Sequence, residues 1–87
     1  MSKRRRGLER FLYQFDKDEG LRQRYADDPD AVGAEMNMAA EEIEALKADD
    51  LATVYEWGLH PLLIRNYSGF RRLDYYGMLR ERGHKPA

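Results

Sequence analysis

Few residues in this sequence could do chemistry, and their spacing does not assemble a catalytic set. Its only imidazoles are His60 and His84, and cysteine is absent. A metal site would need both histidines together with a carboxylate. His84, however, stands beside Gly83 and close to Ala87, the last residue of the sequence. A metal ligand in such a segment would need contacts with another part of the protein to hold it in place. The sequence therefore predicts no catalytic residue, no metal ligand and no cofactor bound by this chain.

Carboxylates are plentiful, but they occur where helices are expected to begin. Three acidic pairs stand at such points: Asp27/Asp28, Glu41/Glu42 and Asp49/Asp50. Capping of free backbone amides and attraction to the positive end of the helix dipole account for them. No phosphate-binding glycine loop occurs, and the Ser and Thr hydroxyls have no evident base partner. Acid–base or nucleophilic catalysis is not indicated.

The elements that must position any binding surface are predicted to be helices. Leu8, Phe11, Leu12 and Phe15 follow the i, i+3, i+4, i+7 spacing of one helix face. Further helices are expected to begin at Asp18, Asp28, Ala39, Asp49 or Asp50, Pro61 and near Leu73. Since no segment alternates with a period of two, the fold class is all-α, a compact bundle of five or six short helices joined by short turns.

Helix ends are also marked in the sequence. Asn37 and Gly58 are residue types that tolerate the left-handed conformation of a C-cap. His60 precedes Pro61 and is expected to be a helix-entry residue that caps the following helix or packs beside Trp57. Ser68-Gly69 is expected to interrupt that helix.

With 87 residues and 10.3 kDa, the chain has room for one small domain. We expect a flexible basic N-terminus over 1–7, a helical domain over 8–82 and a flexible C-terminus over 83–87. Lys3–Arg6 is not followed by an apolar stretch, so no signal or membrane segment is expected. Together with the absence of cysteine, this favours a cytoplasmic protein.

Charge is distributed in three blocks. Residues 1–15 carry five basic and one acidic side chain, 16–56 carry four and thirteen, and 57–87 carry six and two. The two basic ends could lie against the acidic middle of the chain. Alternatively, the blocks could be solvated helix faces, or faces of opposite charge that bind a larger partner. Arginines alternate with tyrosines near the C-terminus, but the acidic middle argues against nucleic acid as a partner.

The second half of the chain is rich in aromatic and aliphatic residues. Leu63, Tyr67 and Phe70 mark the inward face of the helix that begins at Pro61, and Leu73, Tyr76 and Leu79 that of the last helix. One interpretation is the core of a C-terminal helix pair. The other is a partner interface, because interfaces favour aromatic residues, Met and Arg. The candidate interface residues are Trp57, Leu62, Leu63, Tyr67, Phe70 and Tyr76.

A family resemblance spans about residues 9–69. Its segments are Phe15-x-x-Asp18, Asp28-Pro29-x-Ala31-Val32, Glu41-Glu42-x-x-Ala45-Leu46, Asp49-Asp50 and Tyr55-x-x-Gly58-x-His60-Pro61-Leu62-Leu63. This order resembles the small helical alpha-subunit (LigA-like) domain of type II extradiol dioxygenases, of which protocatechuate 4,5-dioxygenase is a member. The Gly58-x-His60-Pro61 step is its most specific part. The sequence departs from the family pattern at Met38-Ala39-Ala40 and in the Arg/Tyr-rich end.

The resemblance implies a non-catalytic small subunit. In that family the iron, its ligands and the catalytic base belong to the large subunit, and the alpha domain packs over the active site as a lid. By similarity, this chain would form a hetero-oligomer with a catalytic subunit that holds Fe(II) and opens a catechol-type ring with O₂. Gly58, His60 and Pro61 would face the partner's pocket, and the apolar side of the next helix would dock.

Two other functions are compatible with the sequence. Similar helical domains serve as recognition segments of ribosomal peptide precursors, although the Arg-Glu-Arg-Gly-His-Lys-Pro-Ala end is a poor substrate for modification by its appearance. A freestanding protein-interaction module is the third alternative.

Overall fold

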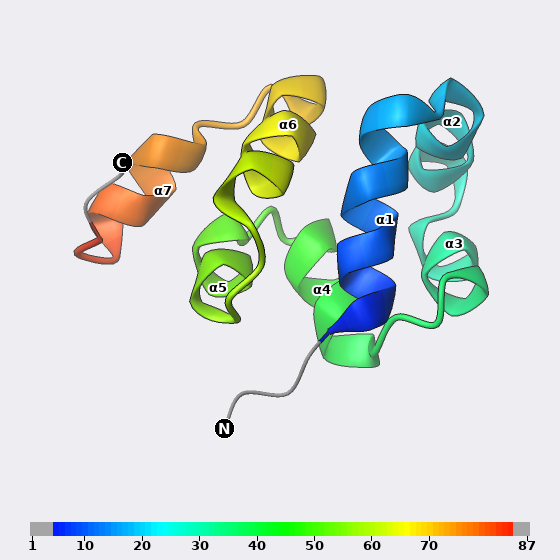
Figure 1. The fold of residues 1–87 in the computed structure, drawn as a ribbon, viewed down its shortest axis with the longest axis horizontal. Coiled ribbons are helices and arrows are strands. Elements are labelled where there is room, and N and C mark those ends of the chain that lie inside the picture. Colours follow the sequence, from blue (N-terminus) through cyan, green and yellow to red (C-terminus); the bar gives the residue numbers. More distant parts are fainter. Residues whose placement is uncertain (1–4, 85–87) are drawn as a thin grey trace.

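The computed structural model describes residues 5–84 and folds them into helices joined by short turns (Figure 1). The helices are α1 (Arg6–Lys17), α2 (Glu19–Asp27), α3 (Pro29–Glu35), α4 (Ala40–Lys47), α5 (Leu51–Glu56), α6 (Pro61–Arg71) and α7 (Tyr75–Glu81). The all-α class is confirmed. The described residues form seven helices rather than five or six, because each polar cap begins a separate element.

Side-chain caps explain where most of these helices begin. The carboxylate of Asp28 accepts a hydrogen bond from the backbone N–H of Ala31 (3.1 Å), directly after α2 has ended. Pro29 then occupies the first helical position, where no N–H is needed. Asp18, Asp50 and Asp74 cap α2, α5 and α7 in the same way. One residue of chain is therefore enough to turn α2 into α3.

Two left-handed residues end helices where the sequence predicted them. Asn37 follows α3 with φ of 58°, and Gly58 follows α5 with φ of 91°. Asp49 and Arg72 also adopt positive φ, at 57° and 56°. Neither was expected, since this conformation is uncommon for residues other than glycine and asparagine.

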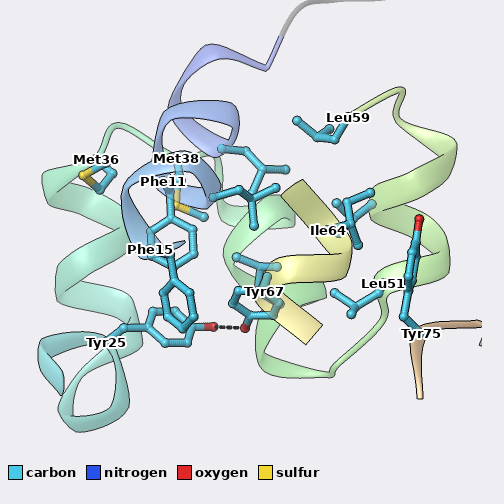
Figure 2. Close-up of a cluster of buried hydrophobic side chains, with 14 of the residues drawn as sticks. Phe11, Phe15, Tyr25, Met36, Met38, Leu51, Leu59, Ile64, Tyr67 and Tyr75 are labelled. Atoms are coloured by element: carbon cyan, nitrogen blue, oxygen red, sulfur yellow. Dashed lines mark hydrogen bonds between the residues drawn. The ribbon is translucent and has the colours of Figure 1, made fainter. Parts of the chain in front are cut away.

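The core is built around α1 and an aromatic cluster. Leu8, Phe11, Leu12 and Phe15 are all buried, as their spacing predicted. Phe11 and Phe15 pack against the rings of Tyr25 from α2 and Tyr67 from α6 (Figure 2). The buried hydroxyls of Tyr25 and Tyr67 are joined by a hydrogen bond of 3.2 Å. Three helices are thus held together by four rings and one polar contact.

The inward faces of α6 and α7 differ from those expected. In α6, Ile64, Tyr67 and Ser68 are buried, whereas Leu63 is half-buried and Phe70 is exposed. In α7, Tyr75 and Leu79 are buried and Tyr76 is exposed. The expectation of an interruption at Ser68-Gly69 was also wrong, because the Ser68 hydroxyl donates to the Arg65 carbonyl (2.7 Å) and the helix continues to Arg71.

Residues on both sides of the expected domain limits of 8 and 82 make contacts with the helical domain. Near the N-terminus, Arg5 lies 3.0 Å from the buried carboxylate of Glu42 and stacks on Trp57, 3.9 Å from the ring centre. That carboxylate also accepts from the Ala39 N–H (2.8 Å) at the start of α4, where no side-chain cap is available. Residues 1–4 and 85–87 of the expected flexible ends lie outside the described residues.

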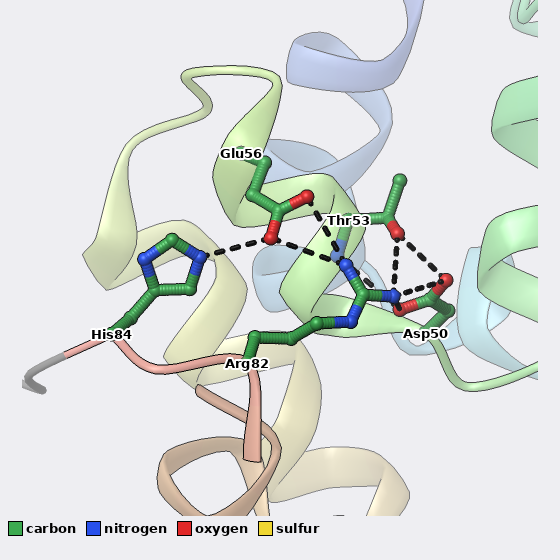
Figure 3. Close-up of polar contacts among 5 residues, drawn as sticks. All are labelled: Asp50, Thr53, Glu56, Arg82 and His84. Carbon is green, nitrogen blue, oxygen red and sulfur yellow. Dashed lines mark hydrogen bonds and ion pairs between the residues drawn. The ribbon is translucent and has the colours of Figure 1, made fainter. Parts of the chain in front are cut away.

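At the C-terminal end, Arg82 and His84 attach α7 to α5 (Figure 3). The Arg82 guanidinium contacts the carboxylates of Asp50 and Glu56, each at 3.1 Å, and the Thr53 hydroxyl. The His84 ring lies 2.9 Å from Glu56. This group of five residues is named the C-terminal clamp below.

Candidate partner-binding face between α1 and α6

Helices α1 and α6 lie side by side and point in the same direction, since both run upward in Figure 1 from their N-terminal to their C-terminal ends. A groove of about 560 Å³ lies between their first turns. It is lined by Glu9, Arg10, Tyr13, His60, Leu62 and Leu63. Towards the ends of the same two helices lies a second depression of about 410 Å³. It is lined by Asp16, Arg65, Asn66, Gly69 and Phe70. Together these residues define the α1–α6 face.

Large apolar side chains are concentrated on the α1–α6 face. Tyr13, Leu62 and Phe70 are 54%, 51% and 47% exposed. Among the described residues, the other large apolar side chain that is clearly exposed is Tyr76, on α7. Apolar groups gathered on one face, with polar neighbours at the rim, are typical of a surface that binds another protein.

His60 occupies the rim of the groove, and its ring also begins α6. The Nδ1 atom accepts a hydrogen bond from the backbone N–H of Leu62 (3.1 Å), as one of the two sequence alternatives predicted. An acceptor at Nδ1 carries no proton, so the neutral ring has its proton on Nε2. The exposed edge of His60 therefore offers a hydrogen-bond donor next to an apolar surface.

The structure brings together some of the predicted site residues. His60, Leu62 and Leu63 share the groove, with the exposed Gly58 and Pro61 in the turn that leads into α6. Phe70 lies on the same face at its far end and carries the Arg22 guanidinium over its ring, 4.1 Å from the centre.

Three other predicted interface residues lie elsewhere. Tyr67 is 0% exposed, so the prediction that it faces a partner is corrected: its ring fills the core. Burial raises its pKa well above the ordinary value of 10.0. Trp57 is half-buried beneath Arg5, and Tyr76 is on α7, where its ring packs on that of Tyr75.

Tyr13 and Arg10 are among the residues of the α1–α6 face that were not identified as site candidates from the sequence. Tyr13 falls outside the i, i+3, i+4, i+7 pattern of α1, next to the buried Leu12, and its position outside that pattern is the signal that it would be exposed. No sequence signal indicates that it shares a groove with Leu62, because that placement depends on how α1 and α6 pack.

The face holds two arginines without a partner among the described residues, in the same two depressions as the carboxylates of Glu9 and Asp16. The guanidinium groups of Arg10 and Arg65 have no ion pair or hydrogen bond within the described structure, whereas Arg5, Arg71 and Arg82 are paired with acidic residues of the middle block. An unpaired arginine beside exposed aromatic groups can bind a carboxylate with two parallel hydrogen bonds.

Within residues 5–84, no group of three His, Cys, Asp or Glu side chains is placed to hold a metal ion. Nor is any helix in this range long and apolar enough to cross a membrane.

Comparison with known proteins gives one match. Residues 8–81 match the family model described as the aromatic-ring-opening dioxygenase LigAB, LigA subunit. No curated protein and no solved structure matches the chain.

Proposed function

The chain belongs to the LigA-subunit family of aromatic-ring-opening dioxygenases, and we propose that it packs on the catalytic subunit as a lid that shapes the substrate pocket. Membership of this family makes the chain a small subunit of an aromatic-ring-opening dioxygenase. The lid role, the identity of the residues at the pocket and the type of substrate are the proposed part.

The observation that carries the proposal is the groove at the start of α6. There the donor edge of His60 stands beside the exposed Leu62 and Tyr13. An apolar surface of this kind is stabilised when a partner covers it, because water is released from it. A lid also needs such a surface, since its task is to exclude water from the reacting centre.

The division of labour follows from the residues of this chain. Fe(II), held by the catalytic subunit, would supply the activation of O₂ and of a catechol-type substrate. This chain would cover the pocket and present the Nε2–H of His60 to an oxygen atom of the substrate or of the pocket wall. Gly58 and Pro61 would fix the turn that aims the imidazole, with Gly58 in a conformation that few other residues adopt.

The test separates the imidazole of His60 from its capping role. Asparagine is a good N-cap, so His60→Asn keeps the start of α6, whereas His60→Ala removes both the ring and the cap. We expect the wild-type chain to raise kcat/KM of the purified catalytic subunit for a panel of catechols. With His60→Asn, binding of the two subunits should be kept and this increase should fall at least several-fold.

A matched control is available in His84→Asn, which changes the other imidazole of the described chain at a position in the C-terminal clamp. That variant should leave kcat/KM of the complex unchanged. If the wild-type chain has no effect on the catalytic subunit, or if His60→Asn behaves as wild type, the lid role with His60 at the pocket is wrong.

A further inference from the structure

Gly69 is a residue that the fold of the isolated chain does not explain. It lies inside α6, two residues before the helix ends, and its φ is not positive. A Cβ atom built at this position meets nothing within 4 Å. Because glycine weakens a helix relative to almost any other residue, neither backbone conformation nor internal packing accounts for it. A glycine in this open position allows the backbone of another molecule to approach the helix closely.

The surroundings of Gly69 point to the same surface. It lines the depression that also holds Arg65 and the exposed Phe70, and this depression lies on the same pair of helices as the groove of His60. The α1–α6 face therefore combines exposed aromatic and aliphatic side chains with arginines. It also includes a stretch of α6 that another molecule can approach closely. This composition is that of a protein–protein interface.

Charge indicates what kind of surface would cover the α1–α6 face. Arg10 and Arg65 lack partners within the described structure, so a surface that supplies carboxylates would complement them. A second copy of this chain has few to offer. Most of its acidic residues are already engaged, some as helix caps and others in ion pairs: Asp18, Asp28, Asp30, Glu35, Glu41, Glu42, Glu44, Asp49, Asp50, Glu56 and Asp74.

We propose that the α1–α6 face is the surface by which this chain docks on the catalytic subunit. Gly69 marks the point of closest approach, and Arg10 and Arg65 pair with carboxylates of that subunit. The inference rests on the proposed function and extends it, because it assigns the interface to two helices and not to the lid turn alone.

The decisive variant adds bulk without harming the fold. Gly69→Gln places a good helix-forming side chain in open space, so the isolated variant should melt at or above the wild-type temperature. Its dissociation constant for the purified catalytic subunit, measured by calorimetry, should rise at least tenfold. The matched control is Ala34→Gln, which adds the same side chain at an exposed position on α3 and should leave binding unchanged.

Charge reversal gives a second, independent readout. The double variant R10E/R65E should weaken binding by more than tenfold, and the wild-type affinity should decline with added salt more steeply than that of the variant. Arg80→Glu is the control, since Arg80 is an exposed arginine on α7 whose side chain has no partner within the described residues.

The outcomes separate this inference from the function on which it rests. If the wild-type chain does not bind the catalytic subunit, both are overturned. If the wild-type chain binds and Gly69→Gln binds equally well, only the assignment of the face is overturned. If the chain alone forms a dimer that Gly69→Gln dissociates, and binding to the catalytic subunit is unaffected, the α1–α6 face is a self-association surface and the assignment is again overturned.

Discussion

Tyr67 shows how far a single residue can be interpreted from its sequence neighbours. The run from Leu62 to Phe70 is apolar on more than one side of the helix, so the spacing favours a core and an interface equally. In the structure Tyr67 fills the core, while Leu62 and Phe70 are half exposed. What decides between them is the direction from which α1 packs on α6, and a local sequence pattern does not contain that information.

A pair of alanine variants tests this assignment. Tyr67→Ala empties a fully buried site beside Phe11 and Phe15, so we expect a loss of about 3–5 kcal/mol in the free energy of unfolding. Leu63 is only half-buried in the groove, and Leu63→Ala should cost about 1–2 kcal/mol because less apolar area is returned to water. Urea unfolding of the isolated chain measures both. A loss from Tyr67→Ala no larger than about 1–2 kcal/mol would mean that Tyr67 is not a core residue.

At the scale of the helices, most boundaries follow from rules of capping. The caps at Asp18 and Asp28 were predicted from residue type and position, as was the left-handed Asn37, and Asp50 is one of the two residues predicted to cap α5. The start of α7 was placed near Leu73 although the cap is Asp74, because the apolar pattern begins one residue earlier. Capping depends on neighbours in sequence, and for this reason it could be predicted.

Asp27 and Asp28 form a matched pair for testing that rule. The two residues are adjacent and both exposed, but only the Asp28 side chain accepts a helix-starting hydrogen bond. Asp28→Ala should therefore cost about 1 kcal/mol, whereas Asp27→Ala should stay within about 0.5 kcal/mol of wild type. Thermal or urea unfolding gives the difference directly. A larger loss from Asp27→Ala than from Asp28→Ala would contradict the cap assignment.

At the scale of the whole molecule, the charge blocks of the sequence become ion pairs that connect the ends to the middle. Arg5 reaches Glu42 across the start of α4, Arg71 reaches Asp49, and Arg82 binds Asp50 and Glu56. From the sequence alone, solvated helix faces and oppositely charged binding faces were also possible arrangements. The sequence could not distinguish them from internal ion pairs, since the paired residues are separated by 22 to 37 positions and meet only in the folded chain.

The C-terminal clamp makes stability depend on acidity. The Thr53 hydroxyl, and further Arg82, lower the pKa of Asp50, and the His84 ring together with Arg82 lowers the pKa of Glu56. Both carboxylates therefore bind protons more weakly in the folded chain than in the unfolded chain. Their contribution to stability is complete above the ordinary values of 3.8 and 4.5, and it is lost as the pH falls through the lowered ones.

Arg82→Gln should reduce this dependence. We expect the variant to be less stable than wild type near neutral pH and to lose less stability on acidification to about pH 3, because Arg82 is the one group that helps to lower the pKa of both carboxylates, after Thr53 for Asp50 and His84 for Glu56. Arg80→Gln, which removes an exposed arginine without a contact, should keep the wild-type profile. Unfolding midpoints measured across the acidic range test this, and identical profiles for wild type and Arg82→Gln would exclude Arg82 as a contributor to the acid dependence.

At this scale the family match identifies the chain as a small subunit of an aromatic-ring-opening dioxygenase. The proposed lid residue His60 lies at one end of the α1–α6 face. His60, Leu62 and Phe70, which the sequence marked as lid or interface candidates, lie on the α1–α6 face, whereas the sequence did not single out Tyr13 or Gly69 as site residues, because their position on this face depends on the packing of α1 against α6.

Oxygen uptake with a catechol substrate tests the central claim most directly. Purified chain supplied with Fe(II) is compared with the catalytic subunit alone and with the two combined. The account predicts no uptake above the iron-only background for the chain alone, and faster uptake for the mixture than for the catalytic subunit alone. Ring opening by the isolated chain would contradict it.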